Sequence, residues 1–399
     1  MNMIADRGQF ESRGRALRVT MLGIRGFPDV QGGAEKHVEK LSSALTALGC
    51  EVEAIVRSGY VDKTRRRWRG IALTPLWAPR VSGFEAFVHS LLGVLRAAID
   101  RPDILHIHSI GPALFTPLAR ALGLRVVVTH HVLNYENDKW GPLARGVLRF
   151  GESVGMKFAN GRIAVSEGLA REMAHSYRVA VNAIPNGIDV PRMIESTGTL
   201  AAFGLTPGRY ALSVARIDEQ KRQLDLVAAY ARLKSPSWRL ALVGGADYSS
   251  SYAKAVADAA RDTSGVVMLG HQSGDALAEL YSHAGVFVLP SSHEGQPIAV
   301  LEAASYGLSL ILSDIPAHRE LALPSARLIA VGDVATLADQ LDTFFAATEP
   351  QRMAASDRDR VLAKHDWHNI AQQTLAVYCE TLSNDGLAAV PAARIKELS

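Results

Sequence analysis

The sequence predicts an α/β protein made of two Rossmann-like, doubly wound domains. Its 399 residues exceed what one hydrophobic core usually supports. Short apolar runs of strand type alternate with helical patterns, which is typical of βαβ units around a parallel sheet. The alternation restarts after the turn-rich stretch AIPNGIDVP. We therefore expect two such domains that face each other across a cleft.

The predicted elements of the first domain, residues 1–188, follow this alternation. Val, Ile and Leu dominate the strands, and Gly49 marks the end of the first helix. In chain order the elements are strand 17–24, helix 34–49, strand 51–57, helix 84–98, strand 104–110, helix 114–121, strand 125–131, helix 144–158 and strand 161–166.

The second domain, residues 189–366, repeats the pattern. Its predicted elements are strand 209–216, helix 223–234, strand 238–245, helix 251–261, strand 265–270, helix 275–284, strand 285–292, helix 297–307 and strand 308–314. A last helical pattern begins at Trp367 and carries an apolar stripe that includes Ile370 and Tyr378. This segment, residues 367–399, is expected to pack on a surface that is already built.

Composition and charge narrow the class of protein. The chain is 48% hydrophobic and 21% charged, as globular proteins are, and it lacks any apolar run long enough to span a bilayer. Two cysteines and no signal-like N-terminal core favour the cytoplasm. Residues 1–190 carry 25 Lys and Arg against 17 Asp and Glu, a net charge of +8, whereas the remainder carries 18 against 23, or −5. The basic half, with Arg65–Arg69 around Trp68, would favour an anionic surface or an acidic ligand; a solvated basic loop is the alternative.

The stretch HEGQPIAVLEA holds the most informative carboxylates. Glu294 lies in a turn, and Glu302 follows eight positions later in a helical pattern. Pro297 suits the first helical position, so the N–H groups from Ile298 onward can meet a phosphate. The two glutamates would then flank a ligand at the helix N-terminus, unless they are simply solvated.

Two further loops could contact an anion. Arg216 ends a predicted strand, and Lys221 and Arg222 open the following helix, where cations oppose the helix dipole unless an anion lies nearby. Gly32 and Gly33 precede the first helix, in a loop that lacks the G-x-G-x-x-G pattern of dinucleotide-binding proteins. A solvated helix start and a tight structural turn are the respective alternatives.

Histidines follow one buried strand. His130 and His131 are adjacent at the end of VVVTHH, so at most one is expected to face a ligand, and the sequence does not decide which. His106 and His108 are two apart on a strand, but they lack a Cys or carboxylate partner with ligand spacing. We therefore predict no metal site.

The chain resembles the retaining GT-B glycosyltransferases, a group that includes sucrose synthases and bacterial mannosyl- and rhamnosyltransferases of surface-polysaccharide assembly. The resemblance covers nearly the whole chain. Its most specific element is the pair Glu294 and Glu302, and supporting matches are the glycine loop, His131 two residues after Thr129, IPNGID at the domain junction, Arg216 with Lys221, and Trp367. It implies an N-terminal acceptor-binding domain, a C-terminal nucleotide-sugar-binding domain, and a return helix that packs on the first domain.

The resemblance also implies a role for each matching residue. Glu302 would hold the nucleotide ribose, Glu294 would lie by the donor sugar, and His131 would contact that sugar near the reacting carbon. Arg216 and Lys221 would neutralise the diphosphate. The implied catalytic residues are His131, Glu294, Arg216 and Lys221. The implied donor-binding residues are Gly32, Gly33, Arg216, Lys221, Glu294, Gly295, Gln296, Pro297, Ile298, Ala299 and Glu302.

The chemistry fits such an assignment. When the bond from the anomeric carbon to phosphate breaks, negative charge develops on the leaving diphosphate, and fixed positive groups can stabilise it without a metal or another cofactor. Retention ordinarily requires a carboxylate nucleophile. The resemblance implies front-face attack instead, with a phosphate oxygen accepting the proton of the acceptor.

Asp357 and Asp359 resemble the metal motif of a sister fold, but they alternate with arginines in a charged helical stretch, where intrahelical pairing is expected.

Other classes of function remain as alternatives. An epimerase or a phosphorylase on the same fold would need extra acid and base groups or a pyridoxal-phosphate lysine, and a nicotinamide oxidoreductase would need the missing glycine fingerprint. A nucleic-acid binder could use the basic cluster at Arg65–Arg69.

The preferred interpretation is a hexosyltransferase of surface-polysaccharide synthesis. Its donor would be a GDP-, UDP- or dTDP-sugar, its acceptor would be a glycan or lipid-linked saccharide, and no nucleic acid is expected as partner. We expect it in the cytoplasm, in peripheral contact with the anionic inner face of the plasma membrane, and we expect acceptor contacts from Tyr135–Trp140 and Arg65–Arg69.

Overall fold

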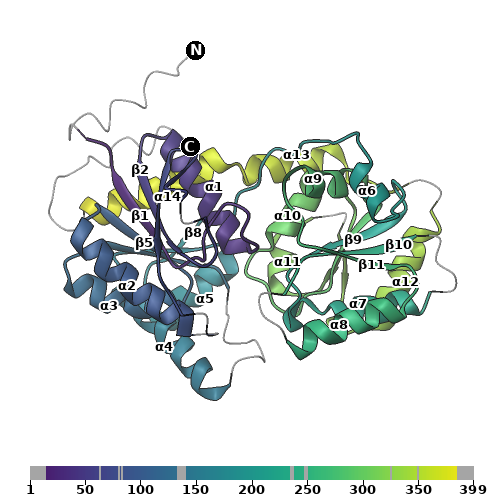
Figure 1. The fold of residues 1–399 in the computed structure, drawn as a ribbon, viewed down its shortest axis with the longest axis horizontal. Helices are drawn as coiled ribbons and strands as arrows, with labels where there is room; N and C mark the ends of the chain where they lie inside the picture. Colours follow the sequence, from purple (N-terminus) through teal and green to yellow (C-terminus); the bar gives the residue numbers. More distant parts are fainter. Residues whose placement is uncertain are drawn as a thin grey trace, which may run out of the picture.

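The computed structural model describes residues 15–383, apart from 63, 80, 82–83, 133–140, 234–237, 247–249, 324–325 and 348–349. It contains two parallel sheets covered by helices, arranged side by side (Figure 1). The predicted α/β class with two Rossmann-like domains is confirmed.

The first sheet has the strand order β3-β4-β2-β1-β5-β6-β7-β8, and all of its pairs are parallel except β3 with β4. Its strands are β1 (Arg18–Leu22), β2 (Glu51–Arg57), β3 (Arg67–Trp68), β4 (Ile71–Leu76), β5 (Ile104–His108), β6 (Val126–His130), β7 (Gly161–Ala164) and β8 (Asn182–Ala183). The short hairpin β3–β4 was not predicted. Arg69 and Gly70, both with positive φ, form its two-residue turn.

Helices cover both faces of this sheet. They are α1 (Gly33–Ala47), α2 (Phe84–Asp100), α3 (Thr116–Ala121), α4 (Pro142–Phe158), α5 (Glu167–Tyr177) and α14 (Trp367–Ser383), with the 3₁₀ helix η3 (Pro112–Phe115) before α3. Alternate strand residues point to opposite faces: Val127 packs in the core shared with α1 and α14, whereas Val126 and Val128 pack in the core shared with α2 to α5. The predicted helix at 114–121 is split into η3 and α3, because Pro117 cannot donate a backbone hydrogen bond.

The second sheet has the order β11-β10-β9-β12-β13-β14 and is parallel throughout. Its strands are β9 (Tyr210–Val214), β10 (Arg239–Val243), β11 (Val266–Gly270), β12 (Val286–Leu289), β13 (Leu310–Ser313) and β14 (Ala326–Ile329). The helices around it are α6 (Gly198–Ala202), η5 (Glu219–Lys221), α7 (Gln223–Ala231), α8 (Ser251–Asp262), α9 (Gly274–His283), α10 (Ile298–Ser305), α11 (Pro316–Glu320), α12 (Val334–Phe345) and α13 (Ala355–Lys364). This order places the topological switch point between β9 and β12, where ligands of such sheets bind.

The chain passes between the two domains twice. The first passage is the predicted domain junction around Asn186, and the second runs from α13 into α14, which packs on α1 and β7 (Figure 1). The two passages are bonded to each other: Ile188 donates its N–H to the His365 carbonyl at 2.8 Å, and the His365 ring contacts the Asn186 carbonyl at 2.7 Å. The junction is therefore a two-chain connection.

Candidate functional site

The loops after β9 and β12 bring a lysine and a glutamate together at the switch point of the second sheet. Lys221 ends η5, and Glu294 lies in the loop after β12. The Lys221 Nζ atom lies 2.6 Å from Glu294 Oε1, and the two side chains are only 14% and 8% exposed. The sequence placed these residues 73 positions apart, and the strand order explains why they meet.

Glu294 is ionised in this environment. Burial by itself would raise the pKa of its carboxyl, but the adjacent Lys221 ammonium, through its charge and its hydrogen bond, brings the pKa below the ordinary value. The site thus holds a fixed negative and a fixed positive charge side by side. An incoming diphosphate can bind Lys221 only if it shares the ammonium with Glu294.

Arg216 and Arg222 have different environments. Arg216 follows β9 by two residues and is half-buried, and its carbonyl accepts from Gln223 Nε2 at 2.8 Å. Arg222 is in the left-handed conformation and pairs with Asp225 at 2.5 Å. The prediction that Lys221 and Arg222 lie in the first turn of the next helix is wrong, because the chain makes a separate 3₁₀ turn at η5 before α7 begins at Gln223.

The start of α10 differs by one residue from the prediction. Pro297 is the N-cap and Ile298 is the first helical residue. Val300 and Leu301 donate to the Pro297 carbonyl, at 3.1 and 3.3 Å. As at any helix N-terminus, the earlier N–H groups, here those of Ile298 and Ala299, have no partner within the helix. These two groups are the donors that α10 can offer to an anion.

Glu302, in the second turn of α10, lies at the contact between the domains. Its carboxylate forms an ion pair with Lys36 of α1 and accepts from Tyr281 Oη at 3.2 Å. Burial lowers the pKa of Lys36, but the charge of Glu302 outweighs it, so the net pKa is raised. The oxygens of the Glu302 carboxylate are therefore occupied by residues of both domains.

The glycine loop before α1 lies against α10. At Gly32 the backbone has φ 151°, and a β-carbon there would collide with the Glu35 carboxylate. A β-carbon at Gly33 would lie 4.0 Å from Ile298 Cδ1. Gly33 thus faces the first residue of α10 across the contact between the domains, as a phosphate-approach loop requires.

Gln31 fixes the same loop to the second domain. Its Oε1 accepts from the Gly245 N–H at 3.1 Å, just beyond β10. Arg25 and Glu35 form an ion pair at 2.9 Å inside the loop. The loop is therefore held in place by its own charges and by the opposite domain.

The two adjacent histidines after β6 point to different surroundings. His130 is fully buried, and its Nε2 lies 2.8 Å from Glu152, which also accepts from Tyr177 Oη at 2.6 Å. His131 Nε2 instead lies 3.2 Å from His108 Nδ1. His130 therefore belongs to the core, whereas His131 lies at the contact between the domains.

His131 is one of three clustered histidines. Ring nitrogens of His37, His108 and His131 lie within 4.8 Å of one another. Burial lowers the pKa of His37 to about 4, and burial also lowers the pKa values of His108 and His131 well below the ordinary range. All three rings are therefore neutral at pH 7. A second layer supports them: His106 bonds Tyr378 Oη and Thr129 Oγ1, both at 2.7 Å.

Neutral imidazoles are potential metal ligands, and this set was missed by the sequence because His37 lies on α1, far from His108 and His131 in the chain. His108 and His131 bond each other, and the His37 ring contacts both, with ring centroids 5.8 and 5.0 Å away. The hydrogen bond from His108 orients the His131 ring. His37 lies four residues after Gly33, in the second turn of α1, and this nearness to the glycine loop was the signal that could have identified it.

Gly295 and Gln296 connect the loop between β12 and α10 to the first domain. A β-carbon at Gly295 would collide with the His131 carbonyl oxygen, so only glycine allows this approach. The Gln296 carbonyl accepts from Asn186 Nδ2 at 2.9 Å, and its side-chain oxygen accepts from the Asn186 N–H. Gln296 thus bonds the junction between the domains, an arrangement that the sequence did not indicate.

The predicted basic cluster is folded onto itself. Arg65 and Arg69 lie over the Trp68 ring, at 5.2 and 5.5 Å, and Trp68 Nε1 donates to Glu39 at 3.0 Å. The Trp68 indole is half-buried against the core that the first sheet shares with α1 and α14.

Tyr135–Trp140, the other predicted acceptor loop, lies outside the described residues. Asp357 pairs with Arg360 within α13 at 2.9 Å, as predicted.

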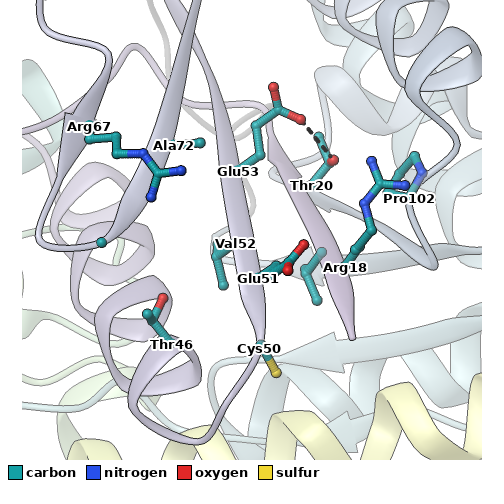
Figure 2. A pocket seen from close by; sticks show the side chains of 12 residues that line it. Arg18, Thr20, Thr46, Cys50, Glu51, Val52, Glu53, Arg67, Ala72 and Pro102 are labelled. Carbon is teal, nitrogen blue, oxygen red and sulfur yellow. Dashed lines mark hydrogen bonds between the residues drawn. The ribbon is translucent and has the colours of Figure 1, made fainter. Parts of the chain in front are cut away.

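A separate cavity lies at the opposite end of the first sheet. It has a volume of about 390 Å³ and is lined by the starts of β1 and β2 with Arg67 and Ala72 (Figure 2). Glu53 reaches across it to Thr20. Parallel sheets bind ligands at the carboxyl ends of their strands, and this cavity is at the amino ends. The site at the domain contact is therefore the functional candidate.

Two family models match the chain. Glycosyltransferase Family 4 matches residues 31–192, and Glycosyl transferases group 1 matches residues 204–360. Among curated proteins, the alpha-maltose-1-phosphate synthase of Mycobacterium tuberculosis is 30% identical over 392 residues, covering 91% of this chain and 99% of that protein. The GDP-mannose:cellobiosyl-diphosphopolyprenol alpha-mannosyltransferase of Xanthomonas campestris is 31% identical over 388 residues, covering 89% and 95%.

Solved structures share the fold. Sucrose-phosphate synthase from Thermosynechococcus elongatus superposes with a TM-score of 0.78 at 21% identity, covering 92% of this chain and all of that one. HepE of Anabaena, in complex with UDP and glucose, gives 0.75 at 17% identity, covering 91% and 99%. These likenesses establish the architecture of two facing Rossmann-like domains.

Proposed function

Since the chain belongs to the glycosyltransferases and has the GT-B fold, we propose that it transfers a hexose from a nucleoside-diphosphate sugar to a glycan or lipid-linked saccharide, with retention of anomeric configuration. The donor would be a GDP-, UDP- or dTDP-sugar. The product would serve the synthesis of a surface polysaccharide, at the cytoplasmic face of the membrane.

One observation carries this proposal. Glu294 and Glu302 flank the start of α10, Lys221 contacts the first, and Gly33 faces the helix start from the other domain. A diphosphate at the N–H groups of Ile298 and Ala299 would have a carboxylate on each side. Carboxylates accept from hydroxyls, so each can hold one sugar: the ribose at Glu302 and the donor hexose at Glu294.

We propose that the leaving diphosphate is stabilised by the protein. Lys221, Arg216 and the N-terminus of α10 would supply positive charge where negative charge develops in the transition state. This predicts that the activity persists in the presence of a metal chelator. The identity of the transferred anomer, read by NMR of the product, tests retention.

His131 is proposed to contact the donor hexose beside the reacting carbon. Its ring is neutral and is hydrogen-bonded to His108, which fixes the ring's orientation. A neutral imidazole can accept or donate a hydrogen bond to a sugar hydroxyl without attracting the diphosphate. The loop at Gly295 brings the donor site and His131 together.

The acceptor is proposed to carry a lipid. A relative of similar length is named for a cellobiosyl-diphosphopolyprenol substrate, whereas another is named for alpha-maltose-1-phosphate. The apolar surface of the first domain, described below, favours the former class for this chain.

Calorimetric titration with a panel of nucleoside diphosphates is the deciding experiment. We expect micromolar binding of one of GDP, UDP and dTDP, and at least a tenfold loss in Glu302→Gln. A matched control is Glu320→Gln, because Glu320 also spans the domain contact, accepting from the N–H groups of Glu167 and Gly168 at 2.6 and 2.9 Å. If no nucleoside diphosphate binds, the proposed function is wrong.

A further inference from the structure

We propose that the outer face of α2 and α4 docks the protein on an anionic lipid bilayer. The face comprises Phe84, Phe87, Leu95 and Ile99 of α2 and Leu143, Val147 and Phe150 of α4, and it is called the α2–α4 face below. The proposal deepens the proposed function, since it rests on that function for the claim that the acceptor is carried by lipid.

Exposed large apolar side chains are concentrated in one part of the molecule. Among the described residues, eleven of fifteen lie between 77 and 158, whereas the second domain and its linker contribute four: Val190, Met193, Leu328 and Val331. Scattered single exposures need no explanation, but a concentrated set marks an interaction surface.

The two helices each expose an apolar stripe. On α4, Leu143, Val147 and Phe150 are 84%, 44% and 60% exposed and are spaced four and three residues apart, which places them on one side of the helix. On α2, Phe84 and Ile99 are 56% and 76% exposed. Soluble helices normally present polar residues on the side away from the core.

The stripes belong to one side of the first domain. Figure 1 shows α2, α3 and α4 together on that side. The helix η3 lies between α2 and α4: Phe87 packs edge-on against Phe115 of η3 at 4.9 Å, and Gly151 of α4 packs on the Ile110 carbonyl just before η3. The stripes are therefore parts of a single surface.

The charge pattern selects lipid as the occupant. The only acidic residue of α4, Glu152, is buried against His130 and Tyr177. The exposed charges of α4 are Arg149 and Lys157, both basic. An amphipathic helix with an apolar stripe and basic flanks is the type that lies in the headgroup region of an anionic bilayer, and the net charge of +8 on residues 1–190 reinforces the attraction.

The position of the face fits delivery of an acceptor. Both helices follow strands of the first sheet, so Phe84 and Leu143 lie at the helix ends nearest to the strand ends that carry His108 and His131. A saccharide attached to a lipid in the bilayer could extend from this rim to His131. The basic loop at Arg65–Arg69 does not offer the same anchor, because Trp68 is bonded to Glu39.

Sedimentation with vesicles tests the inference. The full-length protein is mixed at low salt with vesicles of phosphatidylcholine alone or with one third phosphatidylglycerol. We expect the wild type to bind the anionic vesicles, and the double variant Leu143→Ser, Phe150→Ser to bind at least tenfold more weakly. Val190→Ser, Met193→Ser is the matched control, because these side chains are 82% and 59% exposed but lie on the linker; it should bind as the wild type does.

Two further variants locate the charge contribution. Arg149→Glu should weaken binding to the anionic vesicles severalfold, and Arg66→Glu, in the basic loop, should leave it nearly unchanged. Retained nucleotide affinity and an unchanged circular dichroism spectrum would show that each variant is folded. The inference is overturned if the wild type ignores anionic vesicles, if the serine double variant binds equally well, or if the face instead mediates a dimer that this variant dissolves. Vesicle binding without nucleotide binding would support the face and reject the proposed function.

Discussion

The two domains contribute chemically opposite halves to the site. The first domain presents the buried His37 and His108 and the partly buried His131, which are neutral and supported by their neighbours. The second presents Glu294 and Glu302, whose carboxylates already form ion pairs with Lys221 and Lys36. The first half is organised before a ligand arrives, whereas the second must exchange or share its partners. Variants of the first half should therefore affect turnover, and variants of the second should affect donor binding.

The largest effect is expected at Lys221. Lys221→Met leaves the buried Glu294 carboxylate without its partner, and breaking such a pair costs about 3–5 kcal/mol. The free energy of unfolding, measured in urea, should fall by this amount, and nucleoside-diphosphate affinity should fall with it. Adding Glu294→Gln should restore stability but not affinity. Lys254→Met, which breaks an exposed pair with Asp258, should change neither quantity.

The next effect is on catalysis. His131→Ala should lower kcat by about 10²–10³, or roughly 3–4 kcal/mol, if the ring stabilises the transition state. Nucleoside-diphosphate affinity should remain within about twofold of the wild type. His130→Asn should mainly lower stability, because His130 bonds Glu152 in the core. An equal loss of affinity and of kcat in His131→Ala would abolish the distinction between the two halves.

Acid should lower the free energy of unfolding through the buried histidine cluster. The pKa of His37 is about 4 in the folded protein against about 6.5 when unfolded, so its contribution to stability is complete above pH 6.5 and is lost as pH falls toward 4. From pH 7.5 to 5 this one residue should remove about 2 kcal/mol. Thermal unfolding across this range, compared between the wild type and His37→Asn, measures the contribution. A variant with the same pH dependence as the wild type would contradict it.

The smallest effect is expected at the cross-domain ion pair. Lys36 occupies the carboxylate that is proposed to hold the ribose, so Lys36→Met should tighten nucleoside-diphosphate binding about two- to fivefold, or up to about 1 kcal/mol. Lys40→Met is the matched control, because Lys40 pairs with Asp189 at the linker and does not contact Glu302. Weaker binding in Lys36→Met would mean that the lysine contacts the nucleotide directly.

Local patterns predicted most of the fold. Strands such as Glu51–Arg57 and helices such as Phe84–Asp100 are long and strongly patterned, and their types were predicted correctly. The hairpin β3–β4 was missed, because its turn is Arg69-Gly70 rather than the usual Asn-Gly and because Pro75 interrupts the strand pattern.

The partners of the site residues were less predictable. The spacing of Glu294 and Glu302 is local, so their placement around a helix start could be inferred from the chain. The pairing of Glu302 with Lys36 joins residues 266 positions apart in different domains. Whether His130 or His131 turns toward the core depends on which side of β6 the Glu152 carboxylate reaches. Such choices are made by tertiary packing, on which the local pattern carries no information.

The return of α14 to the first domain sets the order in which the protein can mature during synthesis. Ile370, Val377, Tyr378 and Leu382 belong to the same core as Val19, Val38 and Leu41. Domains usually fold as they leave the ribosome, the N-terminal one first. Here the earliest domain to emerge keeps an open apolar face until Trp367–Ser383, which follows the whole second domain, has been translated. The first domain is thus translated first, but its core is completed only after the second domain has been translated. A nascent chain that stalls or is truncated before α14 would expose the apolar face to chaperones and proteases.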